Sequence, residues 1–509
     1  MTFNRVSYIA FLTGLASIAS TAPASEPTYS VRPDQRELFL DDVGIAEMEN
    51  LKRSMHQPDK KGAVIRPDPQ MGEDIIQIRT APIWDPQAKV YKLWDLYGPL
   101  PGTNGYYESR DGLHWQRPRV GQVEYRGSRD NNYISLQTPK GPRPVTMVVY
   151  DAKDPDPGRR FKSFLPNIGF AISADGIAWE MTDTKAVASS DNFSLSFDTE
   201  QHEFLATVKT GGPHGRAFAL STSTDFANWS EPKLAFHADD LDQQIGLRRI
   251  KERFSNPNFH QPLYNIPATY NIDIYMFSVF RYESMYIGMP ALYHQTGKVP
   301  PNWPGFTMLP IAEEMMVHYR RDGDWAGFHD VQLASSRDLH QWNRLGDREP
   351  FIGSSPLGAG AYDCANIKPP STVIIRDNEL WMYYTGAKTY GPVLDIPAHR
   401  QFGAVCLAVL RRDGFVSLDA GEQPGTVITR VFQLPGKQLL VNVDALNGEL
   451  GVELLDAQGR IIAHSKSLSG DLLEQPVEWA KGDLAQHADQ PVSLRFTGRN
   501  VQFYSYWIE

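Results

Sequence analysis

The chain has few of the features that mark several large protein classes. Its 2 cysteines in 509 residues are too few for a disulfide-built scaffold. It has no basic block, and its formal net charge of −10 argues against nucleic acid as a partner. No apolar run reaches the length of a membrane span, and no glycine-rich phosphate loop, nucleophile elbow or zinc motif occurs.

The N-terminus has the pattern of a secretory signal. Arg5 supplies a positive charge, residues 8–19 are apolar, and Ala22, Pro23 and Ala24 form a small-x-small cleavage site. We therefore expect a signal peptide over 1–24 and a secreted or periplasmic protein, with no membrane span after cleavage. The alternative interpretation is an N-terminal membrane anchor.

A short phrase, Ser-x-Asp-x-x-x-Trp, recurs along the chain. It begins at Ser109, Ser173, Ser223 and Ser336, and a fainter copy at 411–415 keeps the Asp but lacks the Trp. Each copy follows a β-rich run, which predicts a strand that ends in a tight turn. The Asp carboxylate can accept backbone N–H groups in that turn, and the Trp can fold back over apolar surface. Repeats at this spacing indicate a β-propeller with five blades.

The rest of the chain agrees with an all-β fold. The 40 Gly and 37 Pro supply many turns, and alternating apolar and polar residues indicate strands. We predict a five-bladed β-propeller over 25–413, closed by a strand at 36–42, and a C-terminal β-sandwich over 414–509. Strands are expected at 75–83, 90–95, 106–109, 133–136, 145–150, 160–164, 193–198, 203–209, 216–221, 367–375, 379–385 and 403–410.

Two positions in the predicted fifth blade are cysteines, Cys364 and Cys406. An oxidising compartment would allow a disulfide between them. They are expected on the inner and third strands of one blade, which are not neighbours. The sequence therefore favours two buried free thiols.

Two long connections interrupt the blade pattern. The first lies between Trp229 and Tyr282, and the second runs from Gln295 to Trp325. Long loops in a compact domain are often functional, so we expect them to wall a pocket. Trp303 and Trp325 would stack against substrate, and Arg79 and His294 would contact it.

Residues just before the innermost strand of each blade converge on the propeller axis. Counting back from each recurring phrase gives one candidate position per blade. These candidates are Glu73 with Asp74, Asn131 with Asn132, Asp191, Glu283, and Asp363. Gathered carboxylates raise one another's pKa, so that one acid can stay protonated while another is ionised. Glycoside hydrolysis needs that division of roles, and we predict four catalytic acids, Glu73, Asp191, Glu283 and Asp363, with Asn132 binding substrate.

This blade pattern resembles the five-bladed β-propeller glycoside hydrolases: arabinanases, β-xylosidases, invertases and levanases. The similarity spans roughly 37–415, and the chain also resembles secreted bacterial proteins of this fold that are found with polysaccharide-degrading enzymes. The resemblance implies a first-blade base or nucleophile, a second-blade stabilising acid and a third-blade Glu as general acid. Glu73 matches the first position. The second holds Asn131 and Asn132, with Asp151 or Asp154 as substitutes, and the third holds Asp191 in place of Glu.

The predicted function is an exo-acting glycoside hydrolase for a polysaccharide or oligosaccharide, without a cofactor. The gathered carboxylates could also hold a structural Ca²⁺. One alternative is a propeller that binds glycans without catalysis. Another is a phosphorylase, which would need a basic phosphate cluster beside the acids. The sequence shows none there, although Arg248, Arg249 and Arg253 lie in the first long connection. The sugar, the stereochemical course and the oligomeric state are left open.

Overall fold

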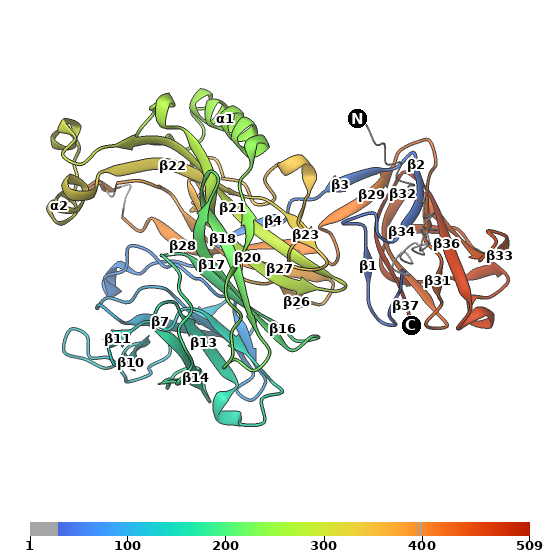
Figure 1. The fold of residues 1–509 in the computed structure, drawn as a ribbon, viewed down its shortest axis with the longest axis horizontal. Helices are drawn as coiled ribbons and strands as arrows, with labels where there is room; N and C mark the ends of the chain where they lie inside the picture. The colour runs from blue at the N-terminus through green and yellow to red at the C-terminus, as the bar shows by residue number, and fades with distance from the viewer. Residues whose placement is uncertain (1–28, 393, 398–399) are drawn as a thin grey trace, which may run out of the picture.

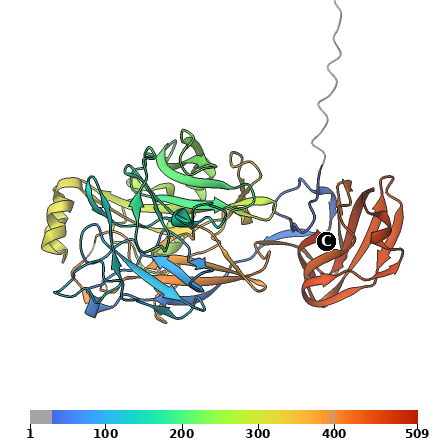
Figure 2. The ribbon, with the colours of Figure 1, turned by 90° about the horizontal axis from the view of Figure 1, so that it is seen from below.

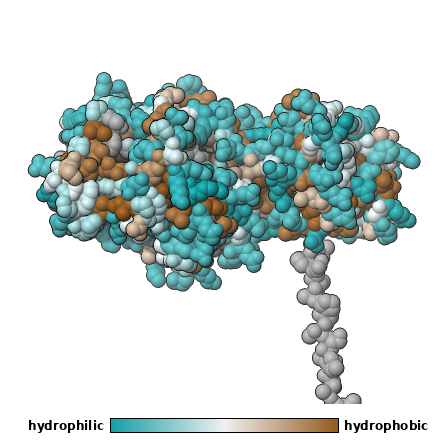
Figure 3. Space-filling view, turned by 90° about the horizontal axis from the view of Figure 1, so that it is seen from above, coloured by the Kyte–Doolittle hydropathy of each residue, from teal (hydrophilic) through white to brown (hydrophobic). Residues whose placement is uncertain are grey.

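The structure is a computed structural model that describes residues 29–392, 394–397 and 400–509. The predicted signal peptide, 1–24, lies outside the described residues. No helix among the described residues has the length and apolar character needed to cross a membrane. Figure 2 shows two lobes side by side, and Figure 3 shows a largely hydrophilic outer face with scattered hydrophobic patches.

The larger lobe consists of five antiparallel sheets of four or five strands, arranged as blades (Figure 1). In chain order, the strands of the first blade are β5 (Ile83–Asp85), β6 (Val90–Trp94), β7 (Asn104–Ser109) and β8 (Trp115–Gln116), with β9 (Tyr133–Ile134) added to β7. Those of the second are β12 (Val148–Tyr150), β13 (Phe161–Leu165), β14 (Gly169–Ser173) and β15 (Glu180–Met181). Those of the third are β16 (Phe193–Asp198), β17 (Glu203–Gly212), β18 (Gly215–Ser223) and β19 (Lys233–His237).

Those of the fourth blade are β20 (Asn271–Tyr282), β21 (Met285–Val299), β22 (Asp324–Val331), β23 (Ala334–Ser336) and β24 (Asn343–Arg344). Those of the fifth are β25 (Asn366–Lys368), β26 (Ile374–Arg376), β27 (Glu379–Ala387), β28 (Gly403–Arg411) and β4 (Asp59–Ile65). Outside the blades, β10 (Leu136–Thr138) pairs with β11 (Gly141–Arg143). The long connections contain helices α1 (Asp240–Ser255) and α2 (Glu313–Asp322).

The smaller lobe is a strongly curled sheet that forms the predicted β-sandwich. It combines strands from both ends of the chain, and β1 pairs with β37 whereas β2 pairs with β30. Its strands are β1 (Glu37–Leu38), β2 (Ile45–Glu49), β3 (Lys52–Met55), β29 (Val416–Ala420), β30 (Gly425–Thr429), β31 (Phe432–Gln433), β32 (Leu439–Asp456), β33 (Ile461–Ser465), β34 (Leu468–Pro476), β35 (Trp479–Lys481), β36 (Pro491–Arg499) and β37 (Val501–Ile508). The predicted fold class, an all-β five-bladed propeller with a β-sandwich, is confirmed.

Closure of the propeller ring differs from the prediction. The strand expected to close it, at 36–42, contributes β1 to the sandwich instead. The ring is closed by β4, which pairs with β28 and becomes the outer strand of the fifth blade. The range predicted for the propeller, 25–413, therefore includes three strands, β1 to β3, that pair in the other lobe. A short strand carries too little pattern to reveal which sheet edge it joins.

The recurring phrase forms the predicted turn. In the second copy, the Asp175 carboxylate accepts the backbone N–H groups of Ile177 at 2.8 Å and Ala178 at 2.9 Å. The Trp179 indole donates to the carbonyl of Gly176 at 2.9 Å, so the ring folds back over the turn. In the other three full copies, the carboxylates of Asp111, Asp225 and Asp338 accept the corresponding backbone N–H groups. The phrase is a structural element of the first four blades.

Each turn also contacts the preceding blade, and this contact explains a glycine requirement. The Trp94 indole of the first blade donates to the Gly176 carbonyl at 2.8 Å. Gly176 has a φ of +74°, and a Cβ added there would lie 2.7 Å from Cζ2 of the buried Trp94. The position therefore needs glycine both for its backbone angle and for the close approach of the indole.

Replacing Gly176 with Ala should lower the free energy of unfolding by about 3 kcal/mol, since the backbone strain adds to an overpacked core. Gly121 is a matched control, because its φ is +72° but no atom lies within 4 Å of an added Cβ. Gly121→Ala should cost only about 1 kcal/mol. Urea unfolding of both variants measures the difference, and equal losses would show that the contact with Trp94 contributes nothing.

Both cysteines are buried and free, as the sequence favoured. Cys364 lies before β25 and Cys406 lies within β28, and β27 separates these two strands in the sheet. The spacing of strands within one blade therefore keeps the two thiols apart.

Candidate functional site

Contacts between blades that are not neighbours locate the propeller axis. Nη2 of Arg79, which precedes β5 in the first blade, donates to Oδ1 of Asn192 at 2.9 Å. Asn192 precedes β16 of the third blade, and the whole second blade lies between the two in sequence. In a closed ring, side chains of blades one and three can meet only across the centre. The Arg79–Asn192 hydrogen bond therefore crosses the axis.

Charged and aromatic side chains from four blades surround this contact. Arg79 comes from the first blade, while β25 of the fifth contributes Lys368, whose Nζ lies 4.7 Å from the ring centre of Tyr275 on β20. We call this set the axial cluster. Its members are Arg79, Asp191, Lys209, Arg216, Asp273, Tyr275, Tyr293, His329, Lys368 and Tyr390.

Asp191 is the exposed carboxylate of the axial cluster. It lies two residues before β16 and has 59% of its side chain exposed, while its Oδ1 accepts a hydrogen bond from the Lys209 ammonium. Burial works to raise the pKa of Asp191, but the hydrogen bond and charge of Lys209, with the charges of Arg216 and Arg79, lower it below its ordinary value. Asp191 is therefore ionised and accessible to solvent.

Asp273 is the buried carboxylate of the axial cluster. It lies on β20, is 3% exposed, and its Oδ2 accepts from Nε2 of Gln295 at 3.0 Å and from the backbone of Arg216 at 3.3 Å. Its Oδ1 is buried without a hydrogen-bond partner. Burial raises the pKa of Asp273 to about 6, although the charge of Arg216 works to lower it. A proton on Asp273 is best placed on Oδ1, because Oδ2 already accepts two N–H groups.

Aromatic rings enclose the guanidinium of Arg216. It lies 5.3 to 5.7 Å from the ring centres of Tyr293, Tyr275 and Trp325. The Tyr390 ring contacts those of Tyr275 and Tyr293 at 5.7 and 5.0 Å. These rings form an aromatic wall beside the two carboxylates, and Trp325 at its edge is 36% exposed.

His329 and Lys368 form the floor of the axial cluster. Nδ1 of His329 lies 2.7 Å from Oδ1 of Asn366, and the same oxygen accepts from the Lys368 ammonium at 3.2 Å. Because Asn366 presents an oxygen there, the proton of the neutral imidazole is on Nδ1, which leaves the lone pair on Nε2. Nε2 is buried without a partner. Burial lowers the pKa of both His329 and Lys368 well below their ordinary values.

Three of the predicted site residues lie in or beside the axial cluster. Arg79 and Asp191 are members, and Trp325 contacts Arg216. The structure therefore brings the predicted third-blade acid, one predicted substrate-binding arginine and one predicted aromatic wall residue together.

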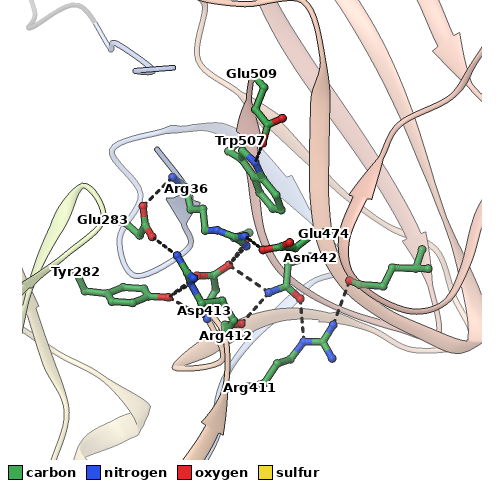
Figure 4. Close-up of polar contacts among 12 residues, drawn as sticks. Arg36, Tyr282, Glu283, Arg411, Arg412, Asp413, Asn442, Glu474, Trp507 and Glu509 are labelled. Carbon is green, nitrogen blue, oxygen red and sulfur yellow. Dashed lines mark hydrogen bonds and ion pairs between the residues drawn. The ribbon is translucent and has the colours of Figure 1, made fainter. Parts of the chain in front are cut away.

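Glu283 lies elsewhere, at the junction of the two lobes (Figure 4). It occupies the turn between β20 and β21, where its carboxylate accepts from Arg412 at 3.0 Å and from the backbone N–H of Arg36 at 3.2 Å. The prediction assumed that Glu283 precedes the inner strand of the fourth blade. That strand is β20, which ends at Tyr282, so Glu283 stands at the opposite end of it.

Glu73 and Asp363 are also held by partners outside the axial cluster. Oε2 of Glu73 accepts from Arg117 at 2.7 Å and from the backbone of Asp68 at 2.8 Å. Asp363 binds the Lys60 ammonium at 2.7 Å, and Lys60 lies on β4, the outer strand of the fifth blade. The structure does not bring either acid together with Asp191.

The other predicted substrate contacts pack within the scaffold. Asn132 donates to the carbonyl of Tyr106 at 3.0 Å, His294 stacks on Phe328 with ring centres 4.6 Å apart, and Trp303 packs edge-on against Tyr264. The prediction that Asn132 lies at the axis treats 133–136 as the inner strand of the second blade. That inner strand is β12, and β9 joins the first blade instead.

Most members of the axial cluster are not among the site residues predicted from the sequence. Asp273 and Tyr275 lie in a stretch assigned to a connection, and Lys209 and Arg216 flank a hairpin in the third blade. The sequence does contain one signal, Asp273 within the apolar β-run 271–275. Burying a carboxylate costs free energy, so a carboxylate in such a run indicates a functional position. His329 and Lys368 are buried in strands in the same way.

The residues of the axial cluster do not fit a calcium ion. Ca²⁺ takes six to eight oxygen ligands, whereas Asp191 binds Lys209 and Asp273 lies beside Arg216. Across the described ranges, no group of three or more His, Cys, Asp or Glu side chains could hold a metal ion. We therefore assign no role to a metal at the axis.

The strand order and the axial cluster define a five-bladed β-propeller with an attached β-sandwich. No protein-family model and no curated protein sequence matches the chain. Solved structures similar to it include glycoside hydrolases. One is the catalytic domain of a GH62 α-L-arabinofuranosidase from Coprinopsis cinerea, with 13% identity over 70% of this chain and 97% of that chain, at a TM-score of 0.39.

Two further structures extend this comparison. A family 43 arabinoxylan arabinofuranohydrolase from Bacillus subtilis has 9% identity, covering 88% of this chain and 99% of that chain, at a TM-score of 0.36. An N-acetylgalactosamine deacetylase from F. plautii has 13% identity, covering 77% and 96%, at a TM-score of 0.37. Similarity at this level does not assign an activity.

Proposed function

We propose that the protein is a glycoside hydrolase whose reaction takes place at the axial cluster. The observation that carries this proposal is the pair of carboxylates, Asp191 and Asp273, which belong to one site but have opposite environments. Asp191 is exposed and bound to Lys209, whereas Asp273 is buried with one oxygen unpartnered. Glycoside hydrolysis requires one carboxylic acid that is protonated and one carboxylate that is ionised.

In this proposal Asp273 is the general acid. It would transfer its proton to the glycosidic oxygen as the bond from that oxygen to the anomeric carbon breaks. The carboxylate left on Asp273 would be stabilised by Arg216, whose backbone N–H already donates to Oδ2 at 3.3 Å. Asp191 would attack the anomeric carbon or take a proton from the water that attacks it. In the first route water then hydrolyses the bond between Asp191 and the sugar, so the two routes give retention and inversion, respectively.

The activity should have a bell-shaped pH profile with its maximum on the acid side of neutrality. Asp273 must be protonated, so activity should fall as the pH rises through its pKa of about 6. Asp191 must be ionised, and its pKa is lowered, so activity should be lost only well into the acid range. Measurement of kcat/KM between pH 3 and 9 tests this, and a maximum above pH 8 would contradict the assignment.

The experiment that tests the proposed function is a screen of plant and algal oligosaccharides for released reducing sugar. Purified protein is compared with the Asp191→Asn and Asp273→Asn variants, and the products are sized. Release of monosaccharides alone would support the exo-action that we propose. Binding of an oligosaccharide without release by the unaltered protein would favour the alternative, a glycan-binding propeller. Full activity in both variants would contradict the proposal.

We also propose a secreted or periplasmic location, which is supported by the signal-like pattern at 1–24. Expression of the full chain in a bacterial host, followed by fractionation and N-terminal sequencing, tests it. Cleavage after Ala24 is the expected result, whereas an uncleaved cytoplasmic product would contradict the proposal.

A further inference from the structure

The axial cluster is rich in positive charge within an acidic protein. It contains four basic side chains, Arg79, Lys209, Arg216 and Lys368, and two carboxylates. The whole chain has a formal net charge of −10, so the cluster concentrates positive charge in a protein that is acidic overall. Lys209 is paired with Asp191, and Arg216 lies 4.0 Å from Asp273. Arg79 and Lys368 have no such carboxylate partner among the ion pairs of the described residues.

Several of these basic groups have donors that no protein group uses. Nε of Arg79 and Nη1 of Arg216 are both buried without a hydrogen-bond partner. The Lys368 ammonium, 3% exposed, donates to Asn366 and otherwise lies over the face of Tyr275. Buried donors are almost always satisfied in folded proteins, and the two unpartnered arginine nitrogens lie in one cluster with Lys368. A ligand with several acceptor oxygens would satisfy them together.

We propose that the axial cluster binds a sugar that carries an anionic group, a carboxylate or a sulfate ester, with Arg79, Arg216 and Lys368 recognising that group. This inference rests on the proposed function in that it names the substrate class of the same site. Guanidinium groups suit such anions because they present several N–H donors in one plane. The aromatic wall of Tyr275, Tyr293 and Trp325 would pack against the ring of the same sugar.

The surroundings of Lys368 indicate that a bound anion should change the pKa of its ammonium group. Burial and the charge of Arg79 lower the pKa of Lys368, while the charge of Asp191 works to raise it. Its other neighbours are Tyr275, Asn366 and the neutral His329. An anion placed beside the ammonium adds a negative charge, which favours the protonated form. Binding of an anionic sugar should therefore raise the pKa of Lys368.

The test is calorimetric titration of the Asp273→Asn variant, which should bind without turnover. The probes are D-glucuronate, D-galacturonate, galactose 6-sulfate and the neutral parents glucose and galactose. At least one anionic probe should bind ten-fold or more tightly than its parent, and the affinity should fall between 20 and 300 mM NaCl. Which anionic probes bind separates carboxylate from sulfate recognition.

Two variants locate the binding group. Lys368→Met keeps the length of the side chain and removes the ammonium, and Arg216→Gln serves if Lys368→Met fails to fold. Each should reduce the preference for the anionic probe at least ten-fold. Lys481→Met is the matched control, since Lys481 is exposed on β35 of the sandwich, and it should change nothing.

The outcomes separate this inference from the proposed function. Equal binding of neutral and anionic sugars, or no binding of any anionic probe at 10 mM, would overturn the inference. Hydrolysis of a neutral oligosaccharide in the screen would then still support the proposed function. Preferential binding of an anionic probe, with no release from uronate-containing or sulfated oligosaccharides, would support the inference and contradict the hydrolase.

Discussion

Asp273→Asn should lower kcat about 10³-fold while the protein stays folded, because general acid catalysis typically contributes 10² to 10⁴ to the rate. The amide keeps the shape of the side chain and can still accept the N–H groups that Oδ2 now accepts from Gln295 and Arg216. It cannot release a proton to the leaving oxygen. A substrate whose leaving group needs no proton, such as a fluoride glycoside, should be affected far less. Steady-state kinetics on both kinds of substrate measure the effect.

The same substitution should make the protein more stable above pH 6. The folded-state pKa of Asp273 is raised to about 6, above the value of an unfolded Asp near 3.9. Its contribution to stability is therefore fully present below pH 4 and is lost as the pH rises through 6. Near pH 8 the buried charge costs about 3 kcal/mol, which an uncharged Asn avoids. Thermal unfolding should show a gain for the variant at pH 8 and little change at pH 4.

Asp324→Asn is the matched control for both effects. Burial also raises the pKa of Asp324 to about 6, and its Oδ2 accepts from Tyr264 at 3.3 Å, outside the axial cluster. This variant should gain stability at pH 8 in the same way but retain its activity. If Asp273→Asn kept more than a tenth of the activity, Asp273 could not be the general acid.

The scaffold could be predicted from the sequence because it repeats. Each turn that begins at a Ser such as Ser173 uses the same local hydrogen bonds, which depend only on residues within the phrase. The third blade, β16 to β18, follows the expected strands closely because its hairpins are short. Local contacts of this kind are encoded within a few residues of chain and need no knowledge of the rest of the fold.

The site was only partly predictable because it depends on which strand is innermost. Asp191 was found because it directly precedes a short and regular blade. Asp273 was missed because the fourth blade extends through the long β21 and β22 strands, so counting back from Ser336 stops at Glu283, at the wrong end of β20. Lys368 lies within its strand rather than before it. Such positions follow from pairing between distant strands, which spacing along the chain does not reveal.

Asp413→Ala should lower the free energy of unfolding by about 3–5 kcal/mol, because it leaves a buried guanidinium without one of its partners. The side chain of Asp413 is fully buried at the junction of the lobes (Figure 4). It binds Arg36 of the N-terminal segment at 2.8 Å and accepts from Tyr282 of the propeller and Ser505 of the sandwich, both at 2.6 Å. One carboxylate therefore joins both lobes and the segment that precedes β1.

Asp471→Ala is the control that separates burial from charge. Asp471 lies at the same junction and pairs with Arg411, but its side chain is 46% exposed. An exposed ion pair contributes about 1 kcal/mol or less, so this variant should unfold almost like the unaltered protein. Urea unfolding of both variants measures the contrast. Similar losses would mean that the Asp413 network does not hold the lobes together, because Asp413 differs from Asp471 in its burial and in its hydrogen bonds with Tyr282 and Ser505.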